Sequence, residues 1–467
     1  MIMLYESRFL RAVAGLLAGM CLLVSCKPQV SLTVVDPGHF HAAMVLREDL
    51  PGVDRTVRVC APDGEGLDAW TASVERFNSR TDSPTHWSVE RIGTLAPAAS
   101  SREVVVLSGD NQLKAQHILD AVSLGYNVLS DKPMAISATD CELLDSAYAL
   151  AAAKGLVIID LMTERHDEVN MAARKALEGR IPRGGSPENP DIVMSSVHHF
   201  YKEVDGVPLR RPAWYYDVRH QGEGLADVTT HLIDLVMWQC FPGETIEPSD
   251  VEVICASHYP TPVTLGQFSA STGCDAFPDY LTDCVSDGVL QVCANGTMLL
   301  RIRDLYVSIT VRWDFAGGPD TFSATYNCPD GPVQVLQDAS TGYSRRLLDC
   351  RATAGDATSH PGAETLTPQS GVDITPSITL THEDHFSLVM QDFLRYVRGA
   401  RMPSRESANT LSKYHLTTSA VEMASRCASG CTPRHAAQPS CPSGTPTCHP
   451  DSSTCHSVRS PGSLPAE

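Results

Sequence analysis

The chain has 467 residues, which is long enough for two domains that each bury a sizeable core. Hydrophobic residues make up 43% and charged residues 19%, which is a globular composition. Lys and Arg number 36 against 55 Asp and Glu, so the formal net charge is −19. Because no basic patch or stripe interrupts this acidic balance, nucleic acid is not expected as a partner.

The first 26 residues are predicted to be a targeting segment. Two arginines precede an apolar stretch over residues 12–24, which is too short to span a bilayer as a mature helix. The stretch ends in the letters LVSC, and small residues before Cys26 resemble the bacterial lipoprotein signal. We therefore expect residues 1–26 to be a signal peptide, with a plain signal peptide or short anchor as the alternative. The protein would be lipid-anchored at Cys26 in the bacterial periplasm or at the cell surface, with no other membrane contact.

Sixteen cysteines are present, and nine of them lie between the leader and the tail. These nine contain no Cys-x-x-Cys pair, so their spacing does not indicate a zinc site and we expect no metal. In an exported protein some of them could form disulfides, but the spacing does not say which.

Short apolar runs alternate with helical stretches from residue 31 to about residue 160. The predicted strands are Leu32–Val35, Thr56–Cys60, Glu103–Leu107, Asn127–Ser130 and Leu156–Asp160. The predicted helices between them are His41–Leu50, Leu67–Asn78, Leu113–Leu124 and Ala138–Ala153. Apolar strands that alternate with helices predict an α/β fold with a doubly wound parallel sheet of the Rossmann type over residues 27–165.

The pattern changes after about Arg165, where strand-like runs separated by Gly, Asn and Asp follow one helix, Glu168–Glu178. The predicted strands are Ile192–Phe200, Val251–Ser257, Gly288–Ala294, Thr297–Ile302, Leu305–Arg312 and Thr321–Tyr326. The pair Asn295-Gly296 predicts a hairpin turn between two of them. This pattern predicts a second, α+β domain with a mixed or antiparallel sheet over residues 166–426.

The C-terminal part of the chain contains one strongly periodic helix. Residues 339–378 are predicted to be rich in loops, and the helix His382–Gly399 follows with a capping box at its start. Residues 427–467 consist mainly of Ser, Pro, Thr, Gly and Cys, and this composition predicts a disordered tail.

Two segments suggest a catalytic site. Lys132 stands in the run Asp-Lys-Pro at the end of a predicted buried strand, which is where open α/β sheets bind ligands. Further along, a glycine-rich turn leads into a predicted helix on which Asp227 and His231 share one face, with Asp234 within reach of it. A carboxylate and an imidazole beside a flexible turn suit general acid–base work. The alternatives are a solvated loop lysine and a buried helix with one satisfied histidine.

The turn after the first predicted strand reads DPGHFH and departs from the dinucleotide pattern G-x-G-x-x-G. Only the middle glycine is present, as Gly38, while Asp36 and His41 take the outer positions. A carboxylate repels pyrophosphate unless it turns away, although His39 or His41 could offset its charge. The run His-Phe-His beside Asp36 also resembles the metal pair of some hydrolases, and this alternative stays open.

The adenosine ribose of a dinucleotide normally meets an acidic residue after the second strand. Here Asp63 is the nearest acid to that position. Because no arginine follows that strand to receive a 2′-phosphate, NAD is favoured over NADP.

Together, these motifs resemble the glucose–fructose oxidoreductase / inositol dehydrogenase (Gfo/Idh/MocA) family over residues 31–426. Asp131-Lys132-Pro133 is similar to its Glu-Lys-Pro motif, and the stretch Gly222–His231 to its glycine…Asp…His helix. The letters SGDN at residues 108–111 are similar to its third-strand loop. The first turn resembles that of a branch of oxidoreductases that are often lipoproteins.

The resemblance implies a homo-oligomeric, NAD(P)-dependent oxidoreductase that acts on a hydroxyl of a sugar, polyol or related carbohydrate, with an open-faced second sheet beside the cofactor. Lys132 would orient the hydroxyl and stabilise its charge, His231 would take its proton, and Asp227 would contact substrate or orient the histidine. The cofactor-binding residues would be Asp36, Gly38, His39, Phe40, His41, Asp63, Gly109, Asn111, Asp131 and Lys132.

Two rivals remain. One is a glycoside hydrolase or lyase that keeps NAD bound and works through transient oxidation, because a periplasmic lipoprotein lacks an obvious supply of free NAD. The other is a non-catalytic sugar-binding lipoprotein.

Overall fold

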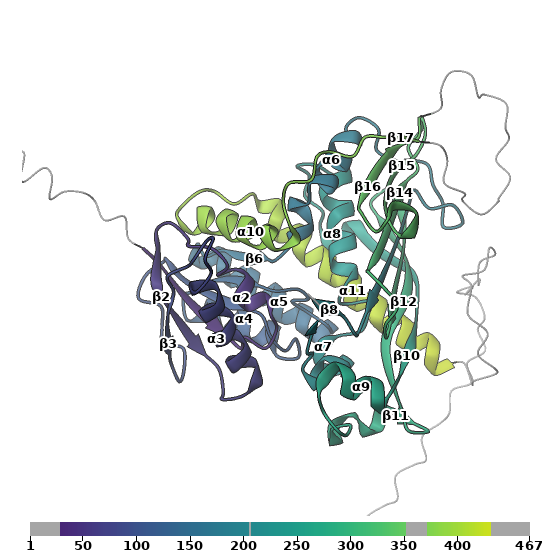
Figure 1. The fold of residues 1–467 in the computed structure, drawn as a ribbon. Helices are drawn as coiled ribbons and strands as arrows, with labels where there is room; N and C mark the ends of the chain where they lie inside the picture. Colours follow the sequence, from purple (N-terminus) through teal and green to yellow (C-terminus); the bar gives the residue numbers. More distant parts are fainter. Residues whose placement is uncertain (1–28, 205–206, 352–370, 431–467) are drawn as a thin grey trace, which may run out of the picture.

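The computed structural model describes residues 29–204, 207–351 and 371–430, which form two large sheets with their helices and one short two-stranded ribbon (Figure 1). The predicted signal peptide lies outside the described residues, as does the predicted tail from residue 431 onward. Among the described helices, none is long and apolar enough to cross a membrane.

The first domain contains a six-stranded, fully parallel sheet with the order β3-β2-β1-β4-β5-β6. Its strands are β1 (Val30–Val35), β2 (Val53–Cys60), β3 (Ser88–Arg91), β4 (Glu103–Leu107), β5 (Asn127–Ser130) and β6 (Ile158–Asp160). This order confirms the predicted doubly wound fold, and it reverses between β1 and β4, where such sheets bind ligands. The sequence pattern missed β3 because that strand is mostly polar and exposed.

Helices cover both faces of this sheet. They are α2 (His41–Met44), α3 (Glu65–Asn78), α4 (Lys114–Ser123) and α5 (Ala138–Lys154). The helix α2 ends well before the predicted Leu50. The indole of Trp70 donates to the carbonyl of Ala42, and that of Trp87 donates to the carbonyl of Leu46 at 2.7 Å. These side chains occupy carbonyls that a longer helix would use.

The second domain is built on a nine-stranded sheet with the order β10-β12-β13-β7-β14-β15-β16-β17 and β11 paired to β12. Its strands are β7 (Ile192–His199), β10 (Val251–Thr264), β11 (Val285–Ser286), β12 (Val289–Ile302), β13 (Leu305–Asp314), β14 (Thr321–Tyr326), β15 (Val333–Gln337), β16 (Arg346–Asp349) and β17 (Val372–Asp373). The pair β13–β7 is parallel and the other pairs are antiparallel, which confirms a mixed sheet. A short ribbon of β8 (Glu203–Val204) and β9 (Val207–Pro208) lies apart from it.

The predicted hairpin turn at Asn295-Gly296 is wrong, because both residues lie inside the continuous strand β12. The side chain of Asn295 binds across strands instead: its amide donates to the hydroxyl of Thr261, and its carbonyl accepts the backbone N–H of Trp313. Gly296 leaves room for Leu225, whose side chain would lie 2.5 Å from an added Cβ. The chain turns later, at Arg303, which has a φ of 52°.

The helices of the second half are α6 (Glu168–Ala176), α7 (Val218–Gln221), α8 (Thr229–Cys240), α9 (Leu265–Thr272), α10 (His382–Val397) and α11 (Ser404–Gly430). The apolar stripe of α10 packs into the core of the first domain, with α2 and α3, although the sequence assigned it to the second. The long helix α11 was not predicted, and it continues past Cys427, the expected start of disorder. It runs between the two domains and along the second sheet (Figure 1).

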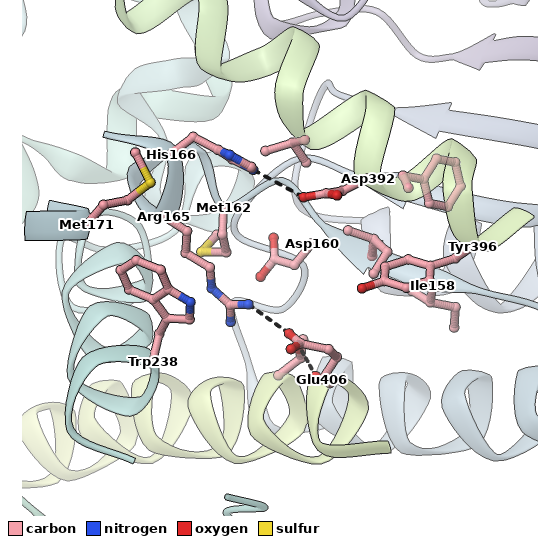
Figure 2. A pocket seen from close by; sticks show the side chains of 14 residues that line it. Ile158, Asp160, Met162, Arg165, His166, Met171, Trp238, Asp392, Tyr396 and Glu406 are labelled. Carbon is pink, nitrogen blue, oxygen red and sulfur yellow. Dashed lines mark hydrogen bonds and ion pairs between the residues drawn. The ribbon is translucent and has the colours of Figure 1, made fainter. Parts of the chain in front are cut away.

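Buried ion pairs join the two domains through α11. The ammonium group of Lys413 is 0% exposed and lies 2.8 Å from Asp160 at the end of β6 and 3.2 Å from Asp234 on α8. Arg165 donates two hydrogen bonds to Asp234 and a third to Glu406 of α11. Figure 2 shows Arg165 reaching toward Glu406 beside a cavity of about 330 Å³ between β6, α10 and α11.

Replacement of Lys413 tests this network. Lys413→Met would leave the two buried carboxylates without their shared cation, so we expect the free energy of unfolding to fall by about 3–5 kcal/mol. Arg426→Met is the control, because Arg426 is 79% exposed and its pair with Glu422 contributes about 0.5 kcal/mol at most. Urea unfolding followed by circular dichroism measures both, and equal midpoints for the two variants would contradict the proposed role of Lys413.

Candidate functional site

The two domains meet at the carboxyl ends of β1, β4 and β5. The loop after β4 bonds directly to the segment before α8: the side-chain amide of Asn111 donates to the carbonyl of Gln221 at 2.7 Å, and its backbone N–H donates to the carbonyl of His220. Asn111 was predicted to bind the cofactor; in the structure its side chain and backbone bind the second domain instead of standing free.

Lys132 follows β5 and reaches across to the second domain. Its ammonium group lies 2.6 Å from the carboxylate of Asp227, which also accepts a hydrogen bond from the side chain of Gln221. Burial disfavours the charge on both groups, but their mutual attraction raises the pKa of Lys132 and lowers that of Asp227. The structure therefore brings together two of the three predicted catalytic residues as a charged pair.

His231 is the third, and it lies in the first turn of α8. Burial lowers its pKa to about 4, and the nearby charge of Lys132 acts in the same direction. Its Nδ1 is buried and has no hydrogen-bond partner among the described residues. A neutral imidazole of this kind can accept a proton from a bound molecule. Asp227 precedes α8 in a turn rather than sharing its face, and Asp234 serves the ion-pair network described above.

The first turn folds differently from a glycine-rich turn. Asp36 takes a left-handed conformation, with a φ of 48°, and its carboxylate accepts the backbone N–H of Asp110 at 3.1 Å. Burial, followed by the charge of Asp110, raises the pKa of Asp36. An added Cβ on Gly109 would lie 2.2 Å from the carbonyl oxygen of Asp36, so this glycine is required by the close approach of two loops. Phe40 is 49% exposed beside them.

His39, His41 and Asp131 converge at the foot of this turn. The Nδ1 of His41 lies 3.0 Å from both oxygens of Asp131, and the Nδ1 of His39 lies 3.3 Å from one of them. Burial opposes the charge on Asp131, but the two histidines hold the pKa of its carboxyl well below its usual range. Within the part of the chain that the structure describes, the Nδ1 of His39 makes no well-aligned hydrogen bond, although it lies close to this carboxylate. The arrangement matches the ligand types of a divalent metal, which was the alternative left open by the sequence.

The residues predicted to bind a nicotinamide dinucleotide suit its two ends unequally. At the nicotinamide end, the charged pair of Lys132 and Asp227 and the neutral His231 are available to a bound molecule. At the first turn, an added Cβ on Gly66 would lie 3.1 Å from the Cα of Gly38, so the start of α3 packs closely against the turn that was predicted to receive the pyrophosphate.

Asp63, the predicted ribose ligand, is 88% exposed and pairs with Arg91 of β3 at 2.7 Å. NAD was favoured over NADP because no arginine was expected near the end of β2. Arg91 lies there in the structure, on the strand β3 that was not predicted.

Sequence reasoning also missed a polar cluster at the end of β7. Asp320 lies 3.0 Å from His198 and 2.5 Å from Lys202. His198 is also close enough to Asp227 to contribute to the lowering of its pKa, although Lys132 and Gln221 lower that pKa more. These residues place further polar groups of the second sheet near Asp227. The run His198-His199 was the signal in the sequence that could have found them.

The buried state of His231 predicts a dependence of stability on pH. Its pKa falls from 6.5 to about 4 on folding, so between these values the unfolded chain binds a proton that the folded chain does not. The contribution of His231 to the free energy of unfolding is therefore complete above pH 6.5, and it is lost as the pH falls toward 4.

His231→Gln should therefore lessen the decrease in unfolding free energy between pH 7 and pH 5, by about 2 kcal/mol. His86→Gln, at a side chain that is 53% exposed, is the control. Urea unfolding at the two pH values measures the difference, and identical decreases in the wild type and His231→Gln would show that the histidine titrates normally.

The family model described as “Putative oxidoreductase C terminal domain” matches residues 168–363 and 351–425. A solved structure described as a “putative oxidoreductase” from Parabacteroides merdae is 34% identical, with a TM-score of 0.80; the match covers 86% of this chain and 98% of that one. No match is found among curated protein sequences.

More distant structures share the fold. KijD10, a 3-ketoreductase from Actinomadura kijaniata in complex with NADP and TDP-benzene, is 14% identical with a TM-score of 0.53, over 85% of this chain and 98% of that one. GenD2 from gentamicin A biosynthesis, in complex with NAD, is 15% identical with a TM-score of 0.53, over 85% of this chain and 94% of that one. The chain belongs to the oxidoreductase family that shares this C-terminal domain, of the Gfo/Idh/MocA type.

Proposed function

We propose that the protein is an NAD(P)-dependent oxidoreductase that acts on a hydroxyl group of a sugar, polyol or related carbohydrate. The observation that carries the proposal is the ion pair of Lys132 from the first domain with Asp227 from the second, with His231 near enough for the charge of Lys132 to lower its pKa. Lys132 is charged and His231 is neutral. This is the division of roles that acid–base chemistry requires.

Each residue has a distinct role in this proposal. The ammonium group of Lys132 would donate to the hydroxyl oxygen and stabilise the negative charge that develops on it. His231 would accept the hydroxyl proton on a ring nitrogen. Asp227 would keep Lys132 charged and oriented. A bound nicotinamide would supply the acceptor for the hydride, which is the cofactor's own chemistry.

The polar cluster at the end of β7 supports a carbohydrate as substrate. His198, Lys202 and Asp320 offer several hydrogen-bond donors and acceptors on the side of the second sheet. Trp214 lies near the first turn, where its ring would be 3.5 Å from an added Cβ on Gly38. Both solved structures named with a nucleotide contain NAD or NADP, which supports a nucleotide here without choosing between the two.

Two substitutions test the catalytic assignment. His231→Ala should lower the rate on an identified substrate by about 10²–10⁴-fold, because the proton acceptor is lost. Lys132→Met should act similarly, because a lost charge near the forming oxyanion is strongly felt in a buried site. Oxidation of a panel of sugars and polyols, followed by the absorbance of the reduced nucleotide, measures both rates.

Nucleotide binding must persist in both variants, because a substitution that only broke the fold would abolish it too. His415→Gln, at a partly exposed histidine of α11, serves as the control. Near-full turnover by His231→Ala would show that this histidine is a core residue. Turnover by the wild type without added nucleotide would instead favour a hydrolase or lyase that keeps its NAD bound.

The convergence of His39, His41 and Asp131 favours a second candidate, a metal-dependent activity at the first turn. The ammonium group of Lys114, which donates to the carbonyl of Asp131 at 3.3 Å, would oppose a cation there. Metal analysis of the wild type and of His39→Gln separates the two candidates. A stoichiometric metal that His39→Gln loses, together with no affinity for NAD or NADP, would support the second.

A further inference from the structure

Three potential metal ligands converge in the second domain, outside the candidate site discussed so far. Glu223 belongs to the segment before α8, His258 to β10 and Cys293 to β12, and their ligand atoms all lie within 4.8 Å of one another. The Nδ1 of His258 is 2.5 Å from the carboxylate of Glu223. Both side chains are largely buried, at 13% and 14% exposure, and Cys293 is half-buried.

A β-bulge brings Cys293 to this place. Tyr259 pairs with Asn295 and Thr261 pairs with Val292, so two residues of β12 stand opposite Pro260 alone. Regular pairing would put Cys293 on the opposite face of the sheet from His258, and the extra residue returns it to the same face. Pro260 suits this position because it has no N–H to donate, and β10 is an edge strand.

The backbone before α8 is pressed against the same part of β12. The N–H of Gly224 donates to the carbonyl of Cys293 at 3.4 Å. A Cβ on Gly224 would lie 1.9 Å from the carbonyl oxygen of Ala294, so only glycine allows this approach. Glu223 therefore has little freedom to move away from Cys293.

We propose that Glu223, His258 and Cys293 bind a divalent cation of the zinc class. Carboxylate, imidazole and thiolate are the three ligand types that zinc takes in proteins, at distances of about 2.0–2.3 Å. The ion would replace the proton shared by Glu223 and His258 and the proton of the thiol, and both would leave to solvent. Three protein ligands leave one position for water or for Cys284, whose thiol is near enough to Cys293 to act on it electrostatically.

A bound cation would hold the segment that leads to Asp227 and His231. Glu223 stands at the start of the turn that leads to Asp227 and α8, so a cation on it would tie that turn to β10 and β12. Cysteine spacing could not reveal this group, because its ligands come from three separate segments of the chain. The proposal does not rest on the proposed oxidoreductase activity, and its test measures metal binding alone.

The test is a titration of the full-length protein, first freed of metal with a chelator, with Zn²⁺ and with Co²⁺. The wild type should bind one equivalent of the metal at this site, and neither Cys293→Ser nor His258→Gln should bind it. Bound Co²⁺ should give a thiolate-to-metal absorption band that Cys293→Ser abolishes. Zn²⁺ should raise the thermal midpoint of the wild type but not of either variant, because a ligand of the folded state stabilises it.

Two matched controls identify the site. Cys60→Ser replaces a half-buried cysteine of the first domain, and His86→Gln replaces a histidine that also pairs with a carboxylate. Both variants should still bind the one equivalent of Zn²⁺. His39→Gln separates this site from the first-turn cluster. Equal Zn²⁺ binding by the wild type, Cys293→Ser and His258→Gln would overturn the proposal and leave Glu223 and His258 as a hydrogen-bonded pair. A Cys284–Cys293 disulfide in the purified protein would overturn it as well.

Discussion

The position of the candidate site depends on a buried set of ion pairs between the two domains. Lys413 of α11 binds Asp160 at the end of β6 and Asp234 of α8, and Arg165 binds the same Asp234 from the other side. Asp234 lies one turn after His231 on α8. Because these charges are buried, each is stable only while its partners stay in place. The network therefore fixes α8, and with it His231, relative to the first sheet.

The candidate site combines a charged and a neutral proton-binding group. Asp227 keeps Lys132 charged through a 2.6 Å contact, whereas burial and that same lysine keep His231 neutral. The two effects support each other, because a protonated His231 would repel Lys132. This separation of pKa values is a product of tertiary structure and requires both domains.

The sequence predicted the parts of the fold that local pattern determines. The apolar strands of the first sheet and the Lys132 and His231 segments were found, because burial and spacing are visible in the chain. The hairpin at Asn295-Gly296 was wrong, because the cross-strand bonds of Asn295 and the packing of Leu225 on Gly296 outweigh turn preference. The helix α11 was not predicted because its buried face includes Lys413. A lysine in the sequence normally indicates an exposed position, so the buried face of this helix was not recognised.

The pyrophosphate turn is the feature for which family membership and local geometry differ most. The chain belongs to an oxidoreductase family, yet the start of α3 lies against Gly38, and two histidines meet Asp131 beneath it. Native mass spectrometry of the purified protein, followed by identification of the small molecules released on denaturation, addresses this directly. An NAD(P)-dependent oxidoreductase should release NAD or NADP on denaturation or bind one of them readily. A protein that holds a stoichiometric metal and shows no affinity for either nucleotide would contradict the proposed activity.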